Sequence, residues 1–143
     1  KHESFPLFSA MTTAGRRIDT TTLKGHNTLF MTAQPSCGFC FDAVVQSVKK
    51  TRALSGDPWN IVLVLFAEAN GEGSPALLAS VGSSVDVILD PDRKLGNQVF
   101  MPDSPYMTVL DKTATVLYKG SGDKLPDLFT AIDIVQSGGT LPE

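Results

Sequence analysis

One segment of this sequence, residues 61–67 (Ile-Val-Leu-Val-Leu-Phe-Ala), contains apolar residues only. A strand that is apolar on both faces has to be covered on both faces, as the inner strands of parallel sheets are. The segment is far too short to cross a bilayer as a helix, which takes about 20 residues. It therefore predicts an inner strand of a layered α/β domain and argues against all-α and all-β folds.

A second predicted strand, residues 28–33, is also apolar enough to be buried on both faces. A turn cluster at residues 34–40 separates it from a predicted amphipathic helix. The apolar residues of that helix recur at the spacing i, i+3, i+4, i+7: Phe41, Val44, Val45 and Val48. We expect the helix to run from about Cys37 to about Leu54.

The other predicted elements continue the alternation of strands and helices. A turn at residues 15–17 predicts a small N-terminal β-hairpin. Further along the chain we expect a helix over 74–80, a strand over 85–89, a short helix over 93–100, a hairpin of strands 107–110 and 115–118, and a last helix with the core face Leu125, Leu128, Phe129, Ile132 and Val135. Ser121 or Asp123 is the expected N-cap of that last helix. This order predicts a mixed sheet flanked by helices.

Composition narrows the class of protein. The chain has 143 residues, 42% of them hydrophobic, which fits one soluble globular domain over residues 1–143. Twelve basic and fifteen acidic residues give a net charge of −3, without a block of like charge. This balance argues against binding to nucleic acid or to an anionic membrane. Because the chain begins at Lys1, we expect the natural N-terminus upstream, where a signal peptide or membrane anchor would lie.

The two cysteines, Cys37 and Cys40, lie three residues apart at the junction of the predicted strand and helix. A thiol at a helix N-terminus faces free backbone N–H groups and the positive end of the helix dipole, and both favour the thiolate. The thiolate is the form that attacks disulfides. The first cysteine of such a pair is the more exposed, so we expect Cys37 to be the nucleophile and Cys40 the resolving thiol.

Three other interpretations of this cysteine pair stay open. A structural disulfide would close a loop of only four residues, which stabilises by about 2 kcal/mol in the chain-entropy model. A zinc site would need two further ligands, and the only histidines are His2 and His26. The pair could also be two inert core thiols. Redox chemistry is favoured because Cys-x-x-Cys near a βαβ pattern is typical of it.

Four stretches of the sequence together resemble a known family. They are Thr22-Leu23-Lys24-Gly25, Ser36-Cys37-Gly38-Phe39-Cys40, Leu89-Asp90-Pro91-Asp92-Arg93-Lys94-Leu95, and Ser104-Pro105 with the following Tyr106-Met107-Thr108-Val109-Leu110-Asp111-Lys112. In order and spacing they are similar, over nearly the whole chain, to the thioredoxin-like thiol-disulfide oxidoreductases of the TlpA/ResA type. The resemblance implies a thioredoxin fold with an N-terminal β-hairpin extension and a central βα insertion.

The resemblance also implies a site. Pro105 would be a cis-proline that faces the cysteine pair, and Pro102 is the alternative candidate for that position. A cis bond costs little only before proline, and the backbone beside it can pair with an extended substrate. The implied catalytic residues are Cys37 and Cys40, and the implied substrate-binding residues are Ser36, Gly38, Phe39, Ser104, Pro105 and Tyr106. We expect no metal and no cofactor.

The sequence departs from the family pattern at several positions. Ser36 replaces the usual Trp before the first cysteine, and Tyr106 replaces the usual Thr after the cis-proline. The Tyr106 ring is expected to stack over the site or to narrow the substrate groove. Many relatives place a buried acid below the second cysteine, but Met31 and Ala43 occupy the two positions used for it. Deprotonation of the second cysteine would then depend on solvent or on Glu68.

The leading hypothesis is therefore a monomeric enzyme that exchanges disulfides with protein substrates and receives electrons from a donor protein. The resemblance implies an extracytoplasmic or periplasmic location, a reducing role, and contact with a membrane only through an N-terminal anchor. A peroxiredoxin-like peroxidase is one alternative, although Phe30 and Gln34 occupy the Pro and Thr positions of its motif. A thioredoxin-fold adaptor or Cu(I) metallochaperone is another.

Overall fold

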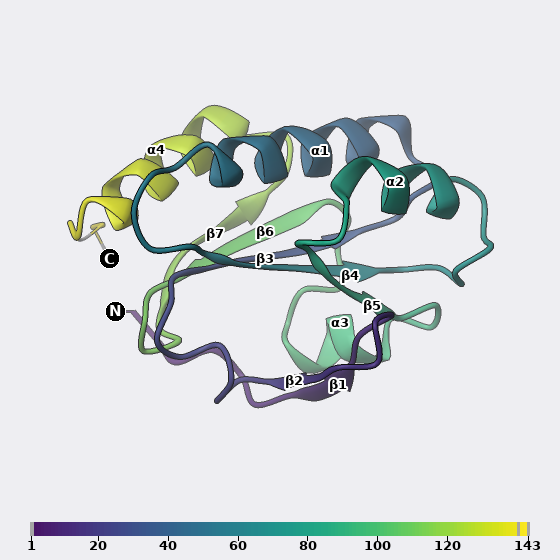
Figure 1. Ribbon diagram of the computed structural model, residues 1–143, viewed down its shortest axis with the longest axis horizontal. Coiled ribbons are helices and arrows are strands. Elements are labelled where there is room, and N and C mark those ends of the chain that lie inside the picture. The colour runs from purple at the N-terminus through teal and green to yellow at the C-terminus, as the bar shows by residue number, and fades with distance from the viewer. Residues whose placement is uncertain (1, 140, 143) are drawn as a thin grey trace.

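The computed structural model describes residues 2–139 and 141–142, and its centre is a five-stranded sheet (Figure 1). The elements in chain order are β1 (Ser9–Met11), β2 (Arg17–Asp19), β3 (Thr28–Ala33), α1 (Gly38–Arg52), β4 (Asn60–Leu65), α2 (Ser74–Val81), β5 (Asp86–Leu89), α3 (Lys94–Gln98), β6 (Tyr106–Leu110), β7 (Val116–Ser121) and α4 (Leu125–Gln136). Each element predicted from the sequence is present, with bounds that differ by a few residues. None of the helices in the described ranges is long and apolar enough to cross a membrane.

The central sheet is mixed, as predicted. Its strand order is β5-β4-β3-β6-β7; β3, β4 and β5 run parallel, while β6 is antiparallel to β3 and β7 antiparallel to β6. All residues of β3 are buried, and in β4 every residue after Asn60 is buried. The two apolar segments of the sequence are therefore two of the three inner strands, and both are covered on both faces.

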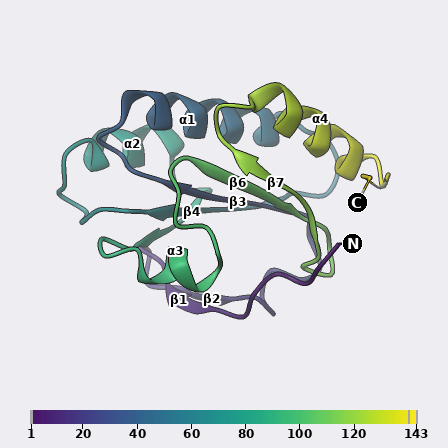
Figure 2. The same ribbon diagram turned by 180° about the vertical axis from the view of Figure 1, so that it is seen from behind.

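Two layers cover this sheet. Helices α1, α2 and α4 lie on one face, here called the helical face, and the β1–β2 hairpin with α3 lies on the other, the hairpin face (Figures 1 and 2). One apolar cluster fills each interface. The helical-face cluster contains Cys40 with residues of β3, β4 and α1, and the hairpin-face cluster contains Phe30, Ile18 and Leu95.

The N-terminal hairpin and the βα insertion are both confirmed. Strands β1 and β2 pair antiparallel, with Ala10 opposite Ile18. The hairpin turn approaches the sheet edge, where the amide of Thr13 donates to the carbonyl of Val87 at 2.8 Å. The pair β5–α3 is the insertion, and it lies between α2 and the β6–β7 hairpin. By covering the edge strand β5, the hairpin reduces its exposure to pairing with other chains.

The predicted N-cap of the last helix is wrong. Helix α4 is capped by Lys124, which makes no side-chain capping hydrogen bond, whereas Ser121 is the last residue of β7. Proline stands in the first turn of α4, where its missing N–H costs nothing, and Asp127 supplies a negative charge near the helix N-terminus. These two features begin the helix without a capping hydroxyl or carboxylate.

Candidate redox site

The cysteine pair lies where β3 ends and α1 begins. Cys37 is the N-cap of α1, with extended backbone, and its sulfur accepts the amide N–H of Cys40 at 3.1 Å. The two cysteines form a disulfide, with Cα atoms 5.2 Å apart. Cys37 is half-buried, whereas the side chain of Cys40 is 2% exposed within the helical-face cluster. The predicted helix start and the predicted difference in exposure are both confirmed.

This placement favours a thiolate on the outer cysteine. The sulfur of Cys37 lies at the end of α1 that carries free N–H groups, and the first turn of the helix holds no acidic residue. No negative charge in that turn opposes the helix dipole. When the disulfide is reduced, Cys37 is the thiol that a partner can reach, and Cys40 is shielded by protein.

A second segment, Pro102 to Pro105, lies against the cysteines. The Ser104–Pro105 peptide bond is cis, as predicted for Pro105 rather than for Pro102. The hydroxyl oxygen of Ser104 lies 3.4 Å from the sulfur of Cys40, although 64 residues separate them in the sequence. The proline segment therefore faces the cysteine pair.

Each of the four residues of this segment accepts a hydrogen bond, and the donors come from three parts of the chain: the end of β3, Arg93 before α3 and Gly122 after β7. The carbonyl of Pro102 accepts from the Arg93 guanidinium at 2.6 Å, and the carbonyl of Asp103 accepts from the Thr32 hydroxyl at 2.7 Å. The hydroxyl of Ser104 accepts from the backbone N–H of Gln34 at 2.6 Å, and the carbonyl of Pro105 from the backbone N–H of Gly122 at 2.8 Å. Together these four hydrogen bonds position the segment relative to the disulfide. The sequence predicted a place at the site for Ser104 and Pro105, with Pro102 as the alternative to Pro105, but it predicted no supporting role for Thr32, Arg93 or Gly122.

Two glycines allow neighbouring segments to approach the site closely. A Cβ on Gly122, which is buried, would lie 2.6 Å from Cγ of Pro105. A Cβ on Gly73 would lie 2.3 Å from the carbonyl oxygen of Pro35, and the backbone of Gly73 is left-handed with φ +82°. At both positions a side chain would displace the backbone next to the cysteines.

Three predicted substrate-binding residues, Ser36, Gly38 and Phe39, lie exposed beside the disulfide. Phe39 lies between the cysteines at the tip of α1 and is 53% exposed. An exposed aromatic next to a reactive sulfur is suited to contact a partner. Substrate binding by these residues stays a prediction.

Tyr106 does not have the position expected of it. Its ring packs against the hairpin-face cluster, whereas the next residue, Met107, points into the helical-face cluster with Cys40. Successive side chains of a strand point to opposite faces, so the expected stacking of Tyr106 over the cysteines is wrong. Burial raises the pKa of Tyr106, and the nearby carboxylate of Asp103 raises it further. The other expectation, that the Tyr106 side chain narrows a substrate groove, stays a prediction.

No buried acid takes the place that relatives use for proton transfer. Met31 and Ala43 are fully buried in the helical-face cluster, as their sequence positions predict. Glu68 is an exposed loop residue whose carbonyl accepts from Ser74. The hydroxyl of Ser104 does reach the inner cysteine. Among the described residues, no group of three or more His, Cys, Asp or Glu side chains could hold a metal ion.

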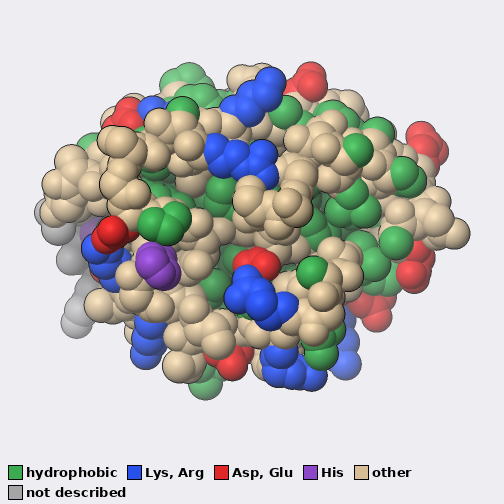
Figure 3. All heavy atoms as spheres, viewed as in Figure 1, with side chains coloured by type: hydrophobic (Ala, Val, Ile, Leu, Met, Phe, Trp, Pro, Cys, Tyr) green, Lys and Arg blue, Asp and Glu red, His purple; other side chains and the backbone are tan. Residues whose placement is uncertain are grey.

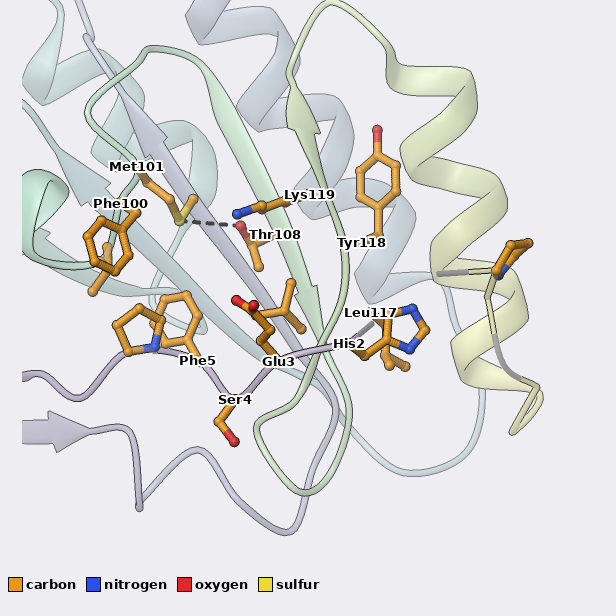
Figure 4. Close-up of a pocket in the computed structure, with 14 residues that line it drawn as sticks. His2, Glu3, Ser4, Phe5, Phe100, Met101, Thr108, Leu117, Tyr118 and Lys119 are labelled. Atoms are coloured by element: carbon orange, nitrogen blue, oxygen red, sulfur yellow. Dashed lines mark hydrogen bonds between the residues drawn. The ribbon is translucent and has the colours of Figure 1, made fainter.

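A pocket of about 680 Å³ lies away from this site, between the N-terminal segment, the loop after α3 and strand β7 (Figure 4). Its lining includes Phe5, Phe100, Thr108 and Lys119 but neither cysteine nor any predicted substrate-binding residue. On the face of the molecule shown in Figure 3, acidic and basic side chains are interspersed with apolar and neutral ones. The pocket in Figure 4 is therefore separate from the cysteine site.

No protein-family model matches this sequence, and no curated protein matches it. Solved structures do. A candidate thioredoxin from Neisseria meningitidis has a TM-score of 0.77 at 20% identity, covering 96% of this chain and 92% of that one. The thioredoxin domain of a thiol-disulfide oxidoreductase from Bacteroides vulgatus has a TM-score of 0.71 at 17% identity, covering 93% and 96%. A secreted disulfide oxidoreductase from Mycobacterium tuberculosis has a TM-score of 0.67 at 17% identity, covering 87% and 95%.

These similarities extend over nearly the whole of each chain, and they confirm the thioredoxin fold that the sequence resemblance implied. At such low identity they establish the fold alone, because one fold supports many functions. The function has to be argued from the cysteine pair and the residues around it.

Proposed function

We propose that the protein is a thiol-disulfide oxidoreductase that exchanges disulfides with protein substrates through Cys37 and Cys40. One observation carries this proposal: the half-buried Cys37 caps a helix N-terminus and is joined to Cys40, which is buried directly behind it. A partly exposed sulfur that the helix dipole activates, backed by a shielded second sulfur, is the arrangement that a two-step exchange needs.

In the reductive direction, the thiolate of Cys37 attacks one sulfur of a substrate disulfide. The Cys37–substrate bond forms, the substrate S–S bond breaks, and the leaving sulfur takes up a proton. The thiolate of Cys40 then attacks the Cys37 sulfur, which forms the Cys37–Cys40 disulfide and releases the second substrate sulfur as a thiolate. Two electrons pass to the substrate, whose disulfide becomes two thiols, and the two enzyme thiols become a disulfide.

A protein substrate would contact the exposed residues around the disulfide. Ser36, Gly38 and Phe39 surround the outer cysteine, and the backbone at the cis Ser104–Pro105 bond lies beside it, where an extended substrate would bind. The four anchored residues of the proline segment are suited to this role, because a rigid backbone loses little conformational entropy on binding. Phe39 supplies the apolar contact.

The proposal also includes a cellular location. We place the protein outside the cytoplasm, where disulfides form and persist. The structural similarity to a secreted disulfide oxidoreductase supports this location. In that setting the protein would act as a monomeric reductant and receive electrons from a donor protein.

Turnover of a protein disulfide tests the proposal. Wild-type protein, supplied with a chemical reductant, should accelerate the reduction of a disulfide-bonded test protein, and the variant Cys37→Ser should have no activity above the reductant alone. Ser80→Ala is the control, because Ser80 is an exposed residue of α2 outside the site. Activity of Cys37→Ser equal to that of wild type would overturn the proposal.

Equilibration with glutathione buffers tests the direction of electron flow. A reductant should have a potential below about −220 mV, and a value near −120 mV, as for a strong oxidant, would contradict the reducing role.

A further inference from the structure

Arg93 has an unusual backbone conformation near the cysteine site. It precedes α3 with φ 60° and ψ 22°, which is the left-handed region that favours glycine. A residue with a Cβ atom is strained there. An observed outlier of this kind is a reason to examine what the side chain does.

The guanidinium of Arg93 joins three separate segments. It stacks over the ring of Phe66 at 4.5 Å, and Phe66 is almost fully buried at the end of β4. One terminal nitrogen donates to the carbonyl of Pro102 at 2.6 Å, and the other makes a longer contact of 3.5 Å with the side-chain oxygen of Gln34. In the described part of the chain no carboxylate lies within 4.0 Å of Arg93, so a structural ion pair does not account for it.

Two of the three segments that Arg93 contacts, those of Gln34 and Pro102, also meet at the inner cysteine. Gln34 begins the turn before Cys37, and its backbone N–H donates to the hydroxyl of Ser104 at 2.6 Å. That hydroxyl lies 3.4 Å from the sulfur of Cys40. A disulfide sulfur has no proton to donate, so in this state the Ser104 hydroxyl is the donor.

From this chain of contacts we propose that Arg93 is a positioning residue for disulfide exchange, which acts by holding the Ser104 hydroxyl as a hydrogen-bond donor to the Cys40 sulfur. The inference rests on the proposed function. In this protein the Ser104 hydroxyl, held in place by Arg93, would take the role beside the inner cysteine that a buried acid has in many relatives.

The effect should fall on the resolving step. A thiolate accepts a much stronger hydrogen bond than a thiol or a disulfide sulfur, so a fixed donor favours the Cys40 thiolate. In that step the Cys40 proton passes to solvent, the Cys37–Cys40 bond forms, and the bond from Cys37 to the substrate sulfur breaks. The first attack, by Cys37, does not depend on this hydrogen bond.

A two-step reaction with dithiobis(nitrobenzoate) separates these events. Reduced protein releases one thionitrobenzoate when Cys37 attacks and a second when Cys40 resolves the mixed disulfide. In Arg93→Met and Ser104→Ala we expect the second release to slow by about tenfold, a loss in the range of a hydrogen bond to a charged group, and the first to change by less than about twofold. Arg17→Met is the control: it makes the same change at an exposed residue of β2, far from the cysteines in the sequence.

The double variant Arg93→Met/Ser104→Ala distinguishes a positioning role from general destabilisation. If Arg93 acts through Ser104, the double variant resolves no more slowly than Ser104→Ala alone, because the two effects are coupled. Additive effects, or equal slowing of both releases, would overturn the proposal.

Two further variants keep the test informative. Arg93→Gly removes the side chain and the backbone strain together, so it should fold and still resolve slowly. Arg93→Lys keeps the charge without the planar fork and should also be slow; a wild-type rate in Arg93→Lys would contradict positioning by the fork. If wild type shows the second release and Arg93→Met shows it at the same rate, this inference is overturned but the proposed function is not. Absence of a second release in wild type overturns the proposed function as well.

Discussion

The sulfur of Cys37 accepts the amide hydrogen of Cys40 at 3.1 Å, so the outer cysteine of the pair is also the cap of the helix that buries the inner one. This contact goes with different environments for the two cysteines. Cys37 is half-buried at the positive end of α1, and Cys40 is 2% exposed within the apolar cluster. The chemistry of the pair therefore follows from where the helix begins.

The two thiols of the reduced protein should react with a small alkylating reagent at very different rates. We expect Cys37 to be modified at least about tenfold faster than Cys40, because it is the accessible thiol and the one at the helix N-terminus. Peptide mapping by mass spectrometry after brief iodoacetamide treatment measures both rates. Faster modification of Cys40 would contradict the assignment of roles.

Gly122→Ala should both destabilise the protein and slow exchange. The new Cβ would lie 2.6 Å from Cγ of Pro105 and 2.9 Å from its Cβ, so the proline segment has to shift. Overpacking of this kind costs about 1–3 kcal/mol in unfolding free energy. Urea denaturation measures the loss, with the exposed neighbour Ser121→Ala as control. If Gly122→Ala matches that control in stability and activity, the close packing on Pro105 is not required.

Thr32→Val should weaken the anchoring of the proline segment. The Thr32 hydroxyl donates to the carbonyl of Asp103 at 2.7 Å, and valine keeps the shape while removing the donor. We expect a loss of about 0.5–1.5 kcal/mol in unfolding free energy, together with slower turnover. Thr130→Val, which alters an exposed hydroxyl within α4, is the matched control. Equal stability of the two variants would show that the anchor contributes nothing.

Phe39→Ser should affect substrate binding and leave stability unchanged. The ring is 53% exposed, so its loss changes the unfolding free energy by no more than about 0.5 kcal/mol. KM for a protein disulfide should rise several-fold, whereas KM for a small cystine derivative should not. Leu7→Ser removes a side chain that is 80% exposed elsewhere and serves as control. A rise in KM for both substrates would point to damage at the cysteines instead.

Both tyrosines should ionise above their ordinary pKa of about 10. Burial raises the pKa of Tyr106 and of Tyr118, and the carboxylate of Asp103 adds to the first shift and that of Asp127 to the second. Since the chain has two tyrosines, the tyrosinate absorbance reports on these two only. Their contribution to stability is fully present below about pH 10 and is lost as the pH rises through the folded pKa values. A titration midpoint at or below 10 in the folded protein would contradict the shifts.

The elements of this fold were predictable because their signals are local. The apolar run at residues 61–67 predicted an inner strand, and the spacing of Phe41, Val44 and Val48 predicted the helix that carries the cysteines. Hydrophobic periodicity depends on neighbours a few residues apart, so it can be read from one sequence. The cap of the last helix was missed because Lys124 caps through its backbone alone and leaves no mark in the sequence.

The cysteines and Pro105 were predictable from their motifs, but the contacts that support them were not. Ser104 and Cys40 are 64 residues apart, and the contact of Arg93 with Gln34 spans 59. Such contacts depend on how strands and loops meet in space, so they cannot be predicted from residue type alone. The prediction for Tyr106 was wrong for a similar reason. Tyr106 and Met107 are both large, and the sequence does not show which of the two faces the cysteines.

Trapping of the mixed disulfide tests the central claim most directly. Reduced Cys40→Ala protein, mixed with a disulfide-bonded test protein, should accumulate a one-to-one covalent complex. Mass spectrometry should locate the linkage at Cys37, and a reducing agent should cleave it. Wild-type protein should instead form the Cys37–Cys40 disulfide and release reduced substrate. A Cys40→Ala protein that forms no such complex, while remaining folded, would contradict the account.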